Sequence, residues 1–121
     1  MKQTDDYLLR QIQTVAAMIA RAAGLRLEGS PDEARAVLEQ AYGVLLAGQT
    51  TLIRRLDAGT AASLLGTPER ILMLARLLEE ESGLDGNTAL HERAIALARE
   101  ALRRDPENDE ARAMLAGLSA P

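Results

Sequence analysis

The sequence predicts an all-α protein that forms a single domain over residues 1–121, with about five to seven helices. Apolar residues recur at spacings of three and four along most of the chain, which is the period of a helix with one buried face. No run of β-branched or aromatic residues alternates with polar ones, so strands are not expected. The length suits one hydrophobic core and is too short for two independent ones.

The first two helices are predicted over residues 5–26 and 31–48. The apolar face of the first consists of Leu8, Ile12, Val15, Ile19 and Ala23. Ser30, Pro31 and Glu33 have the spacing of a capping box, in which the Ser30 hydroxyl accepts from the Glu33 amide and the Glu33 carboxylate reaches back. The second helix should therefore begin at Pro31. Its apolar face consists of Ala34, Val37, Leu38, Ala41 and Leu45.

The middle of the chain alternates between weak and strong helix patterns. Within the segment 49–66, helix is expected to resume after Gly48, to break at residues 57–60 and to form one short piece over residues 60–65. Thr67, Pro68 and Glu69 then mark a clear helix start. That helix is apolar nearly all round, which predicts a central, buried position. It is expected to end at residues 79–83, where three glutamates precede Gly83 and form a solvated helix end.

Two further helices are predicted at the carboxyl-terminal side of the sequence. The first covers residues 88–104, and Arg103 and Arg104 complement the helix dipole at its end. Asp105 is expected to cap the last helix, with Pro106 at its first position. The apolar face of this helix consists of Ala111, Met114, Leu115 and Leu118.

Small residues in two of these helices follow a repeat pattern. Ala94, Ala98, Ala101 and Pro106 have the spacing found in the second helix of a tetratricopeptide repeat, and so do Gly29, Ala34, Leu38 and Ala41. The chain therefore resembles tetratricopeptide repeats over residues 15–48 and 88–118. This resemblance implies an array of antiparallel helix pairs. Residues 49–66 fit no repeat.

Residues 6–12, with the sequence DYLLRQI, carry a second resemblance. Together with the order of helices, they are similar to a family of small bacterial proteins that contain a domain of unknown function. That resemblance implies a bacterial protein of tetratricopeptide-like fold, and no known activity.

Composition disfavours several classes of partner. A formal net charge of −4 gives no attraction to phosphate, and Tyr7 and Tyr42 are the only aromatic residues, so nucleic acid is not expected to bind. Charged and polar residues interrupt every apolar run, so no membrane partner is expected. The lack of cysteine and of a secretory signal predicts a cytoplasmic location.

The sequence contains no pattern of catalytic residues. His91 is the only histidine, and Ile95 stands where a zinc motif would need the second one, so His91 is interpreted as a surface residue. The serines lack the glycines of a nucleophile elbow. The pairs Arg54-Arg55 and Arg103-Arg104 are expected to cap helix ends or form surface ion pairs. We therefore predict a protein that is not an enzyme and has no metal or cofactor.

The tetratricopeptide resemblance implies a groove lined by the first helix of each pair. Its groove-facing positions here are Ala16, Ile19, Ala23, Arg26, Glu110, Ala113 and Gly117. They lack the lysine and asparagine clamp that some repeats use for a carboxylate, so an apolar or helical protein segment is the expected partner. The alternative is that the same residues are core, packed on Val37, Leu38 and Leu97.

Two further expectations concern assembly and an alternative function. Solenoids usually need three or more stacked pairs, and two pairs with a spare segment fall short, so a homodimer is predicted. The alternative function is a small-ligand sensor or enzyme with a pocket between helices. Its polar contacts would come from Tyr7, Tyr42, His91 or Arg70.

Overall fold

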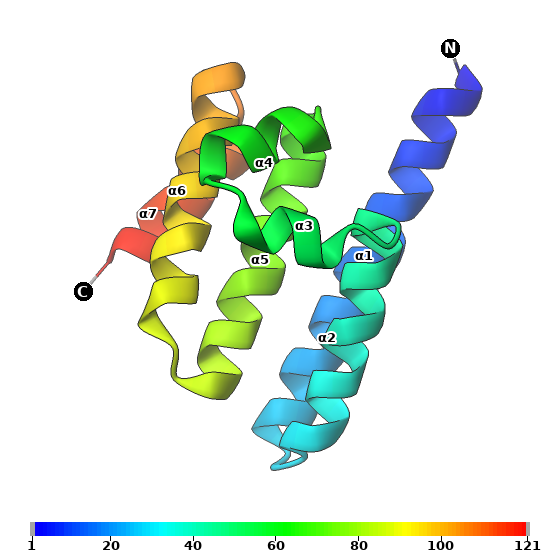
Figure 1. The fold of residues 1–121 in the computed structure, drawn as a ribbon, viewed down its shortest axis with the longest axis vertical. Coiled ribbons are helices and arrows are strands. Elements are labelled where there is room, and N and C mark those ends of the chain that lie inside the picture. The colour runs from blue at the N-terminus through cyan, green and yellow to red at the C-terminus, as the bar shows by residue number, and fades with distance from the viewer. Residues whose placement is uncertain (1, 121) are drawn as a thin grey trace.

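The computed structural model describes the backbone of residues 2–120 and the side chains of residues 6–120. This part of the chain is all-helical and contains no strand, as predicted (Figure 1). Its seven helices match the upper end of the expected number. They are α1 (Lys2–Leu27), α2 (Pro31–Leu46), α3 (Thr50–Arg55), α4 (Ala58–Leu65), α5 (Pro68–Asp85), α6 (Thr88–Arg104) and α7 (Asp109–Ser119).

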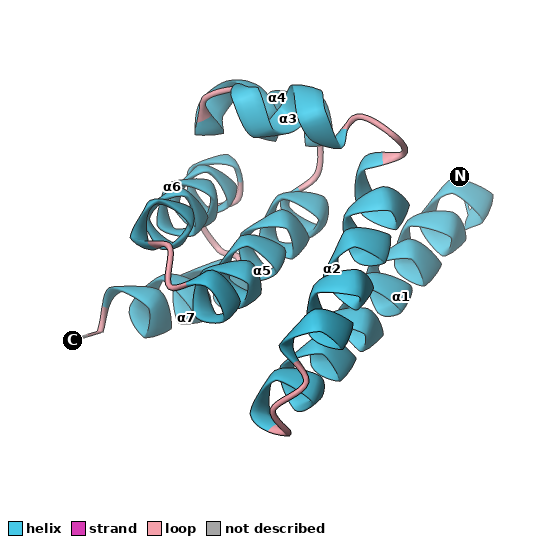
Figure 2. Cartoon of the chain, turned by 60° about the horizontal axis from the view of Figure 1, so that its bottom comes forward, coloured by secondary structure: helices cyan, strands magenta, loops and turns pink. Residues whose placement is uncertain are grey.

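The long helices form an array of antiparallel pairs. Helix α1 packs on α2, and α5 packs on α6 through a turn of only two residues, Gly86 and Asn87. Helix α5 also contacts both α1 and α2, which joins the two pairs, and α7 packs on α6 (Figure 2). The predicted array of helix pairs is therefore confirmed.

Helix α5 is the centre of the core, as its pattern predicts. Its residues 71–75, 77 and 78 are buried on every side, because α1, α2, α4 and α6 all contact this helix. Buried alanines on the neighbouring helices let the backbones approach closely. The buried alanines of α2 and α6 are Ala34, Ala41, Ala94, Ala98 and Ala101.

The segment 49–66, which fits no repeat, folds as α3 and α4 on one side of the array. Helix α3 contacts α2, and α4 contacts α6 and α5. The predicted break lies at Leu56 and Asp57, between α3 and α4, and the predicted short helix begins at Ala58 instead of residue 60. Asp57 is the N-cap of α4, and its carboxylate accepts from the amide and the hydroxyl of Thr60 (3.3 and 2.6 Å).

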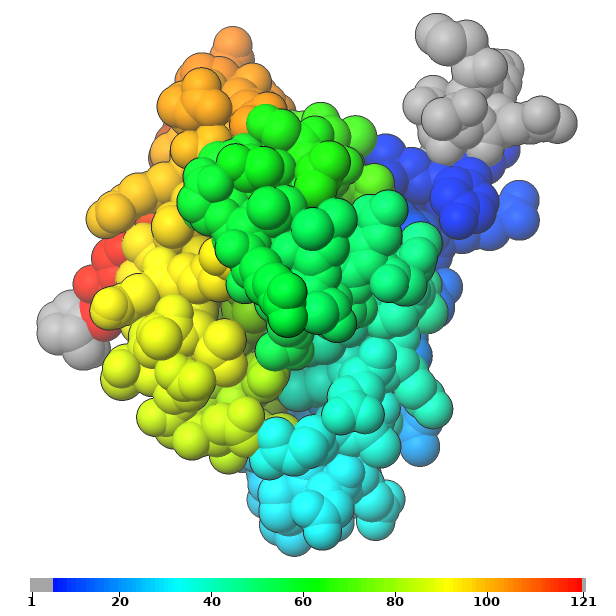
Figure 3. Space-filling view, in the orientation of Figure 1, coloured from blue at the N-terminus to red at the C-terminus, as the bar shows by residue number. Residues whose placement is uncertain are grey.

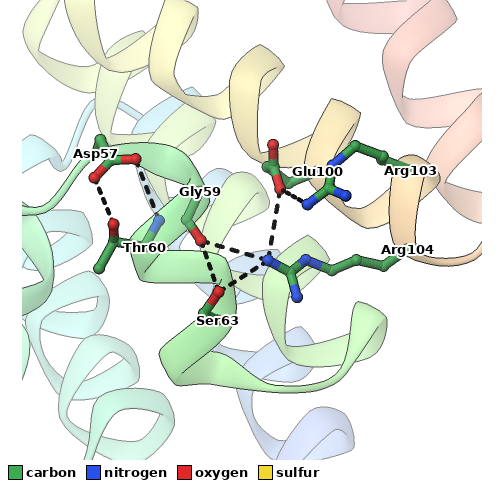
Figure 4. Close-up of polar contacts among 7 residues, drawn as sticks. All are labelled: Asp57, Gly59, Thr60, Ser63, Glu100, Arg103 and Arg104. Carbon is green, nitrogen blue, oxygen red and sulfur yellow. Dashed lines mark hydrogen bonds and ion pairs between the residues drawn. The ribbon is translucent and has the colours of Figure 1, made fainter.

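Arginines attach this segment to its neighbours. Arg93 of α6 donates from Nη2 to the carbonyl oxygen of Ile53 (2.7 Å). Figure 4 shows Arg104 reaching from the end of α6 to Ser63 Oγ and the Gly59 carbonyl (3.0 and 3.4 Å). Segment 49–66 therefore covers the side of the array formed by the second helices, α2 and α6.

One predicted cap and two predicted helix ends are wrong. Helix α2 begins at Pro31 as predicted, but the Ser30 hydroxyl makes no capping bond, and the Ser30 backbone amide donates to Leu25 O at the end of α1. Helix α7 begins at Asp109, three residues after Pro106, since Asn108 caps it by accepting from the Ala111 amide (2.9 Å). Helix α5 runs through Gly83 to Asp85 and ends at Gly86, whose φ of 66° suits the left-handed region.

Candidate functional site

A hollow of about 220 Å³ lies between α1, α5 and α7, and one of the predicted groove residues, Ile19, lines it. Helix α1 contributes Ile19, and α7 contributes Met114 and Leu118. These apolar side chains are half-buried, and they lie across α5, which forms the floor of the hollow through Ala75. The hollow therefore has an apolar centre that draws on three helices.

The predicted groove residues divide into three groups. Ile19 lines the hollow, while Arg26 and Glu110 belong to ion pairs with α5 at its margin. Ala113 is exposed on α7, and Ala16 and Ala23 are half-buried on α1, but none of these three is among the residues lining the hollow. Of the predicted groove residues, Ile19 therefore lines the hollow, and the groove itself stays a prediction.

Two ion pairs connect α5 to the outer helices. Arg26 Nε lies 2.6 Å from Glu80 Oε2, and the Glu80 side chain is only 12% exposed. The hydrogen bond from Arg26 to Glu80 raises the pKa of the arginine. Arg76 Nη2 lies 2.9 Å from Glu110 Oε1 on α7. The apolar centre is therefore flanked by paired charges.

The contribution of α5 to the hollow is missing from the sequence prediction. Arg76, Glu79 and Glu80 line it beside Ala75, and all come from one helix. Their spacing of three and four residues places them along one polar strip of an otherwise apolar helix. This strip was the signal in the sequence that a buried helix also reaches the surface.

The three glutamates of α5 are not a solvated helix end, which corrects the sequence interpretation. Glu80 meets Arg26 of α1, Glu81 meets Arg54 of α3 (2.9 Å), and Glu79 Oε1 lies 2.6 Å from His91 Nδ1 on α6. Successive helix residues point about 100° apart. A central helix can therefore direct three consecutive carboxylates to three different neighbours.

A larger hollow, of about 450 Å³, lies between α2, α3 and α5. Tyr42 at its floor is buried, and its hydroxyl donates to Glu81 Oε1 (2.6 Å). The Arg54 guanidinium lies over the Tyr42 ring, 4.6 Å from its centroid, and Arg35 lines the margin. Burial, with the bond to Glu81 second, raises the pKa of Tyr42 well above its usual range.

The remaining residues named for a small-ligand site lie apart from Tyr42. Tyr7 and Arg70 line a separate hollow of about 300 Å³ between α1 and the ends of α2 and α5. His91 is half-buried beside Glu79. The structure therefore does not bring the four candidate residues into one pocket.

The described residues provide neither a metal site nor a membrane-spanning helix. No three histidine, aspartate or glutamate side chains of residues 6–120 gather in a way that could hold a metal ion. Among the helices of residues 2–120, none combines the length and apolar character needed to cross a bilayer.

Comparisons with protein-family models, with curated proteins and with solved structures each gave no match. The resemblances to tetratricopeptide repeats and to the small bacterial family therefore remain predictions from residue spacing and from the N-terminal motif.

Proposed function

We propose that the protein is a non-enzymatic, cytoplasmic interaction module of tetratricopeptide-like type, which binds an apolar helical segment of a partner protein in the hollow between α1, α5 and α7. The observation that carries this proposal is the half-buried apolar centre of Ile19, Met114 and Leu118. Three helices converge on it without filling it.

The composition of the hollow suits a helical ligand. Protein interfaces commonly have an apolar centre, which contributes most of the affinity, and a polar margin. Here the margin consists of the pairs Arg26–Glu80 and Arg76–Glu110, whose charges are already matched. A partner therefore gains most from an apolar side chain in the centre, which is the pattern of a helix laid in a groove.

The variant Ile19→Glu tests this function by placing a charge in the centre of the hollow. Partners captured from a bacterial lysate by the wild-type protein, and identified by mass spectrometry, should be lost with Ile19→Glu. The matched control is Leu64→Glu, because Leu64 is 51% exposed on α4, away from the hollow. Equal capture by both variants, with helical content unchanged by circular dichroism, would refute the proposal.

A small-ligand sensor is the second candidate, and the larger hollow beside Tyr42 favours it. Its margin carries Arg35 and Arg54, and its floor has the Tyr42–Glu81 pair. A ligand bound only to the folded state raises stability in proportion to the logarithm of its concentration. A metabolite screen by thermal shift should then reveal a compound whose effect disappears in Arg35→Gln. No shift across the screen would remove this candidate.

A further inference from the structure

The N-terminal turns of α1 extend beyond the end of α2 (Figure 1). In the space-filling view, the α1 residues drawn in blue stand at the edge of the molecule, beside the end of α2 (Figure 3). Tyr7 is 69% exposed and Leu9 is 55% exposed, although both belong to the DYLLRQI motif. Val44, on the adjoining turn of α2, is 38% exposed. Two apolar side chains of the motif, Tyr7 and Leu9, are therefore left exposed by both helix pairs.

A hollow of about 260 Å³ lies on one flank of this projecting helix. Its lining residues are Tyr7, Arg10, Gln11, Thr14 and Val44. The Gln11 side chain donates to the Val44 carbonyl (3.1 Å), which fixes the α2 side of the hollow. The exposed Tyr7 side chain contributes an aromatic ring to its lining.

The charges beside this hollow are self-complementary. Asp6 and Arg10 are exposed and four residues apart, so they lie on the same face of α1. Neither forms an ion pair with a residue whose side chain the structure describes. In an antiparallel pairing of two copies centred on residue 8, Asp6 of each copy faces Arg10 of the other. Two identical ion pairs would form, as a two-fold interface requires.

The same pairing gives the exposed aromatic ring a position. Tyr7 of one copy then lies opposite residue 9 of the other copy. Along the helix axis of that second copy, this position falls between its own Tyr7 and Gln11. The ring of one copy therefore reaches the hollow that the other copy forms with Tyr7, Arg10 and Val44. A knob and its matching hole on one surface are what an isologous contact needs.

We propose that the surface formed by Asp6, Tyr7, Arg10 and Thr14 of α1 and by Val44 of α2 binds a second copy of the chain in antiparallel orientation. The contact does not depend on the proposed partner groove. Standard interfaces take about 800 Å² from each partner, and a few turns of helix supply less than that. The dimer should therefore dissociate in the micromolar range.

Absolute mass by light scattering over a concentration series tests the proposal. The wild-type mass should rise with concentration from 13.0 kDa toward twice that value. Tyr7→Glu should keep the protein monomeric. Asp6→Arg and Arg10→Asp should each weaken the dimer about tenfold or more, since each brings two like-charge contacts. The control Arg21→Asp changes an exposed charge on α1 outside the contact and should have no effect.

Rescue identifies the second copy as the occupant. The double variant Asp6→Arg/Arg10→Asp restores both ion pairs and should dimerise like the wild type. A mixture of the two single variants should form heterodimers in preference to either homodimer. An unrelated partner would not respond to this exchange.

Several results would overturn the proposal. A wild-type protein that stays monomeric to high micromolar concentration would do so, as would a dimer unaffected by both single charge changes. A dimer lost in Ile19→Glu but kept in Tyr7→Glu would place the second copy in the groove. Binding of monomers to anionic lipid vesicles, lost in Tyr7→Glu, would assign the surface to a membrane. If a variant lost partner capture but still dimerised, the result would bear on the proposed groove and not on the contact between two copies.

Discussion

Arg70 links the ends of two helices, and its replacement measures how much that link stabilises the fold. Its guanidinium donates from Nη2 to Leu45 O (2.8 Å) and from Nη1 to Leu65 O (3.0 Å), in the last turns of α2 and α4. Such carbonyls have no partner within their own helix. Arg70→Met keeps the apolar stem and removes both bonds.

The magnitude follows from the two bonds and the exposure of the residue. A hydrogen bond to a charged group contributes about 1.5–3 kcal/mol. Arg70 is half-buried, so water replaces part of the lost bonding, and removal of its Nε, which is buried without a partner among the described residues, offsets more. We expect a loss of about 2 kcal/mol, or a fall in Tm of roughly 6–12 °C for a chain of this size.

Urea unfolding followed by circular dichroism measures this loss directly. The matched control is Arg99→Met, because Arg99 is exposed on α6, and its effect should stay within about 0.5 kcal/mol. Hydrogen exchange at the Gly66 amide, which donates to Ala62 O, should accelerate in Arg70→Met as α4 loosens. A loss no larger than that of the control would refute the argument that Arg70 holds α2 and α4 together.

Three further outcomes follow from the core and the helix ends. Leu97 is fully buried, so Leu97→Ala should lower the free energy of unfolding by about 2–5 kcal/mol, while Leu64→Ala at a half-exposed position should change it far less, by urea unfolding. Ala47 has a φ of 50°, which favours glycine, so Ala47→Gly should raise Tm, corresponding to a gain of up to about 1 kcal/mol. Folding raises the pKa of Tyr42 above the usual tyrosine value of 10.0. The free energy of unfolding is therefore highest below that pH and falls as the pH rises beyond it. Tyr42→Phe should remove this fall in alkaline urea titrations, and a fall of equal size in the variant would contradict the assignment.

The parts of the fold that local sequence signals determine were predictable. The helix over residues 88–104 was predicted with the bounds it has, and the helix beginning at Pro68 has the expected Thr67 cap, whose hydroxyl accepts from the Arg70 amide (3.2 Å). Caps, prolines and apolar periodicity act within a few residues. Each of these signals therefore lies in the sequence next to the helix end or helix face that it determines.

The end of α5 shows where local reasoning fails. An end was predicted there because Gly83 follows three glutamates, although acidic side chains oppose the dipole at a helix C-terminus. Their partners Arg26, Arg54 and His91 lie 54, 27 and 12 residues away in the chain. These partners offset a dipole effect of about 0.3–1 kcal/mol, and none of them is adjacent in the sequence. For the same reason, contacts between residues distant in sequence, the contribution of α5 to the candidate groove was not predicted.

The position of segment 49–66 could not be predicted from a residue pattern, because several of its contacts are made through backbone carbonyl oxygens. Arg70, Arg93 and Arg104 donate to the carbonyl oxygens of Leu65, Ile53 and Gly59, and a carbonyl acceptor leaves no residue type to recognise. The position of the segment bears on the predicted dimer. Since α3 and α4 cover the α2 and α6 side, that side does not need a second copy to bury it. A reason for self-association therefore has to be sought at the uncovered end of α1, where Tyr7 and Leu9 are exposed, rather than in a missing repeat.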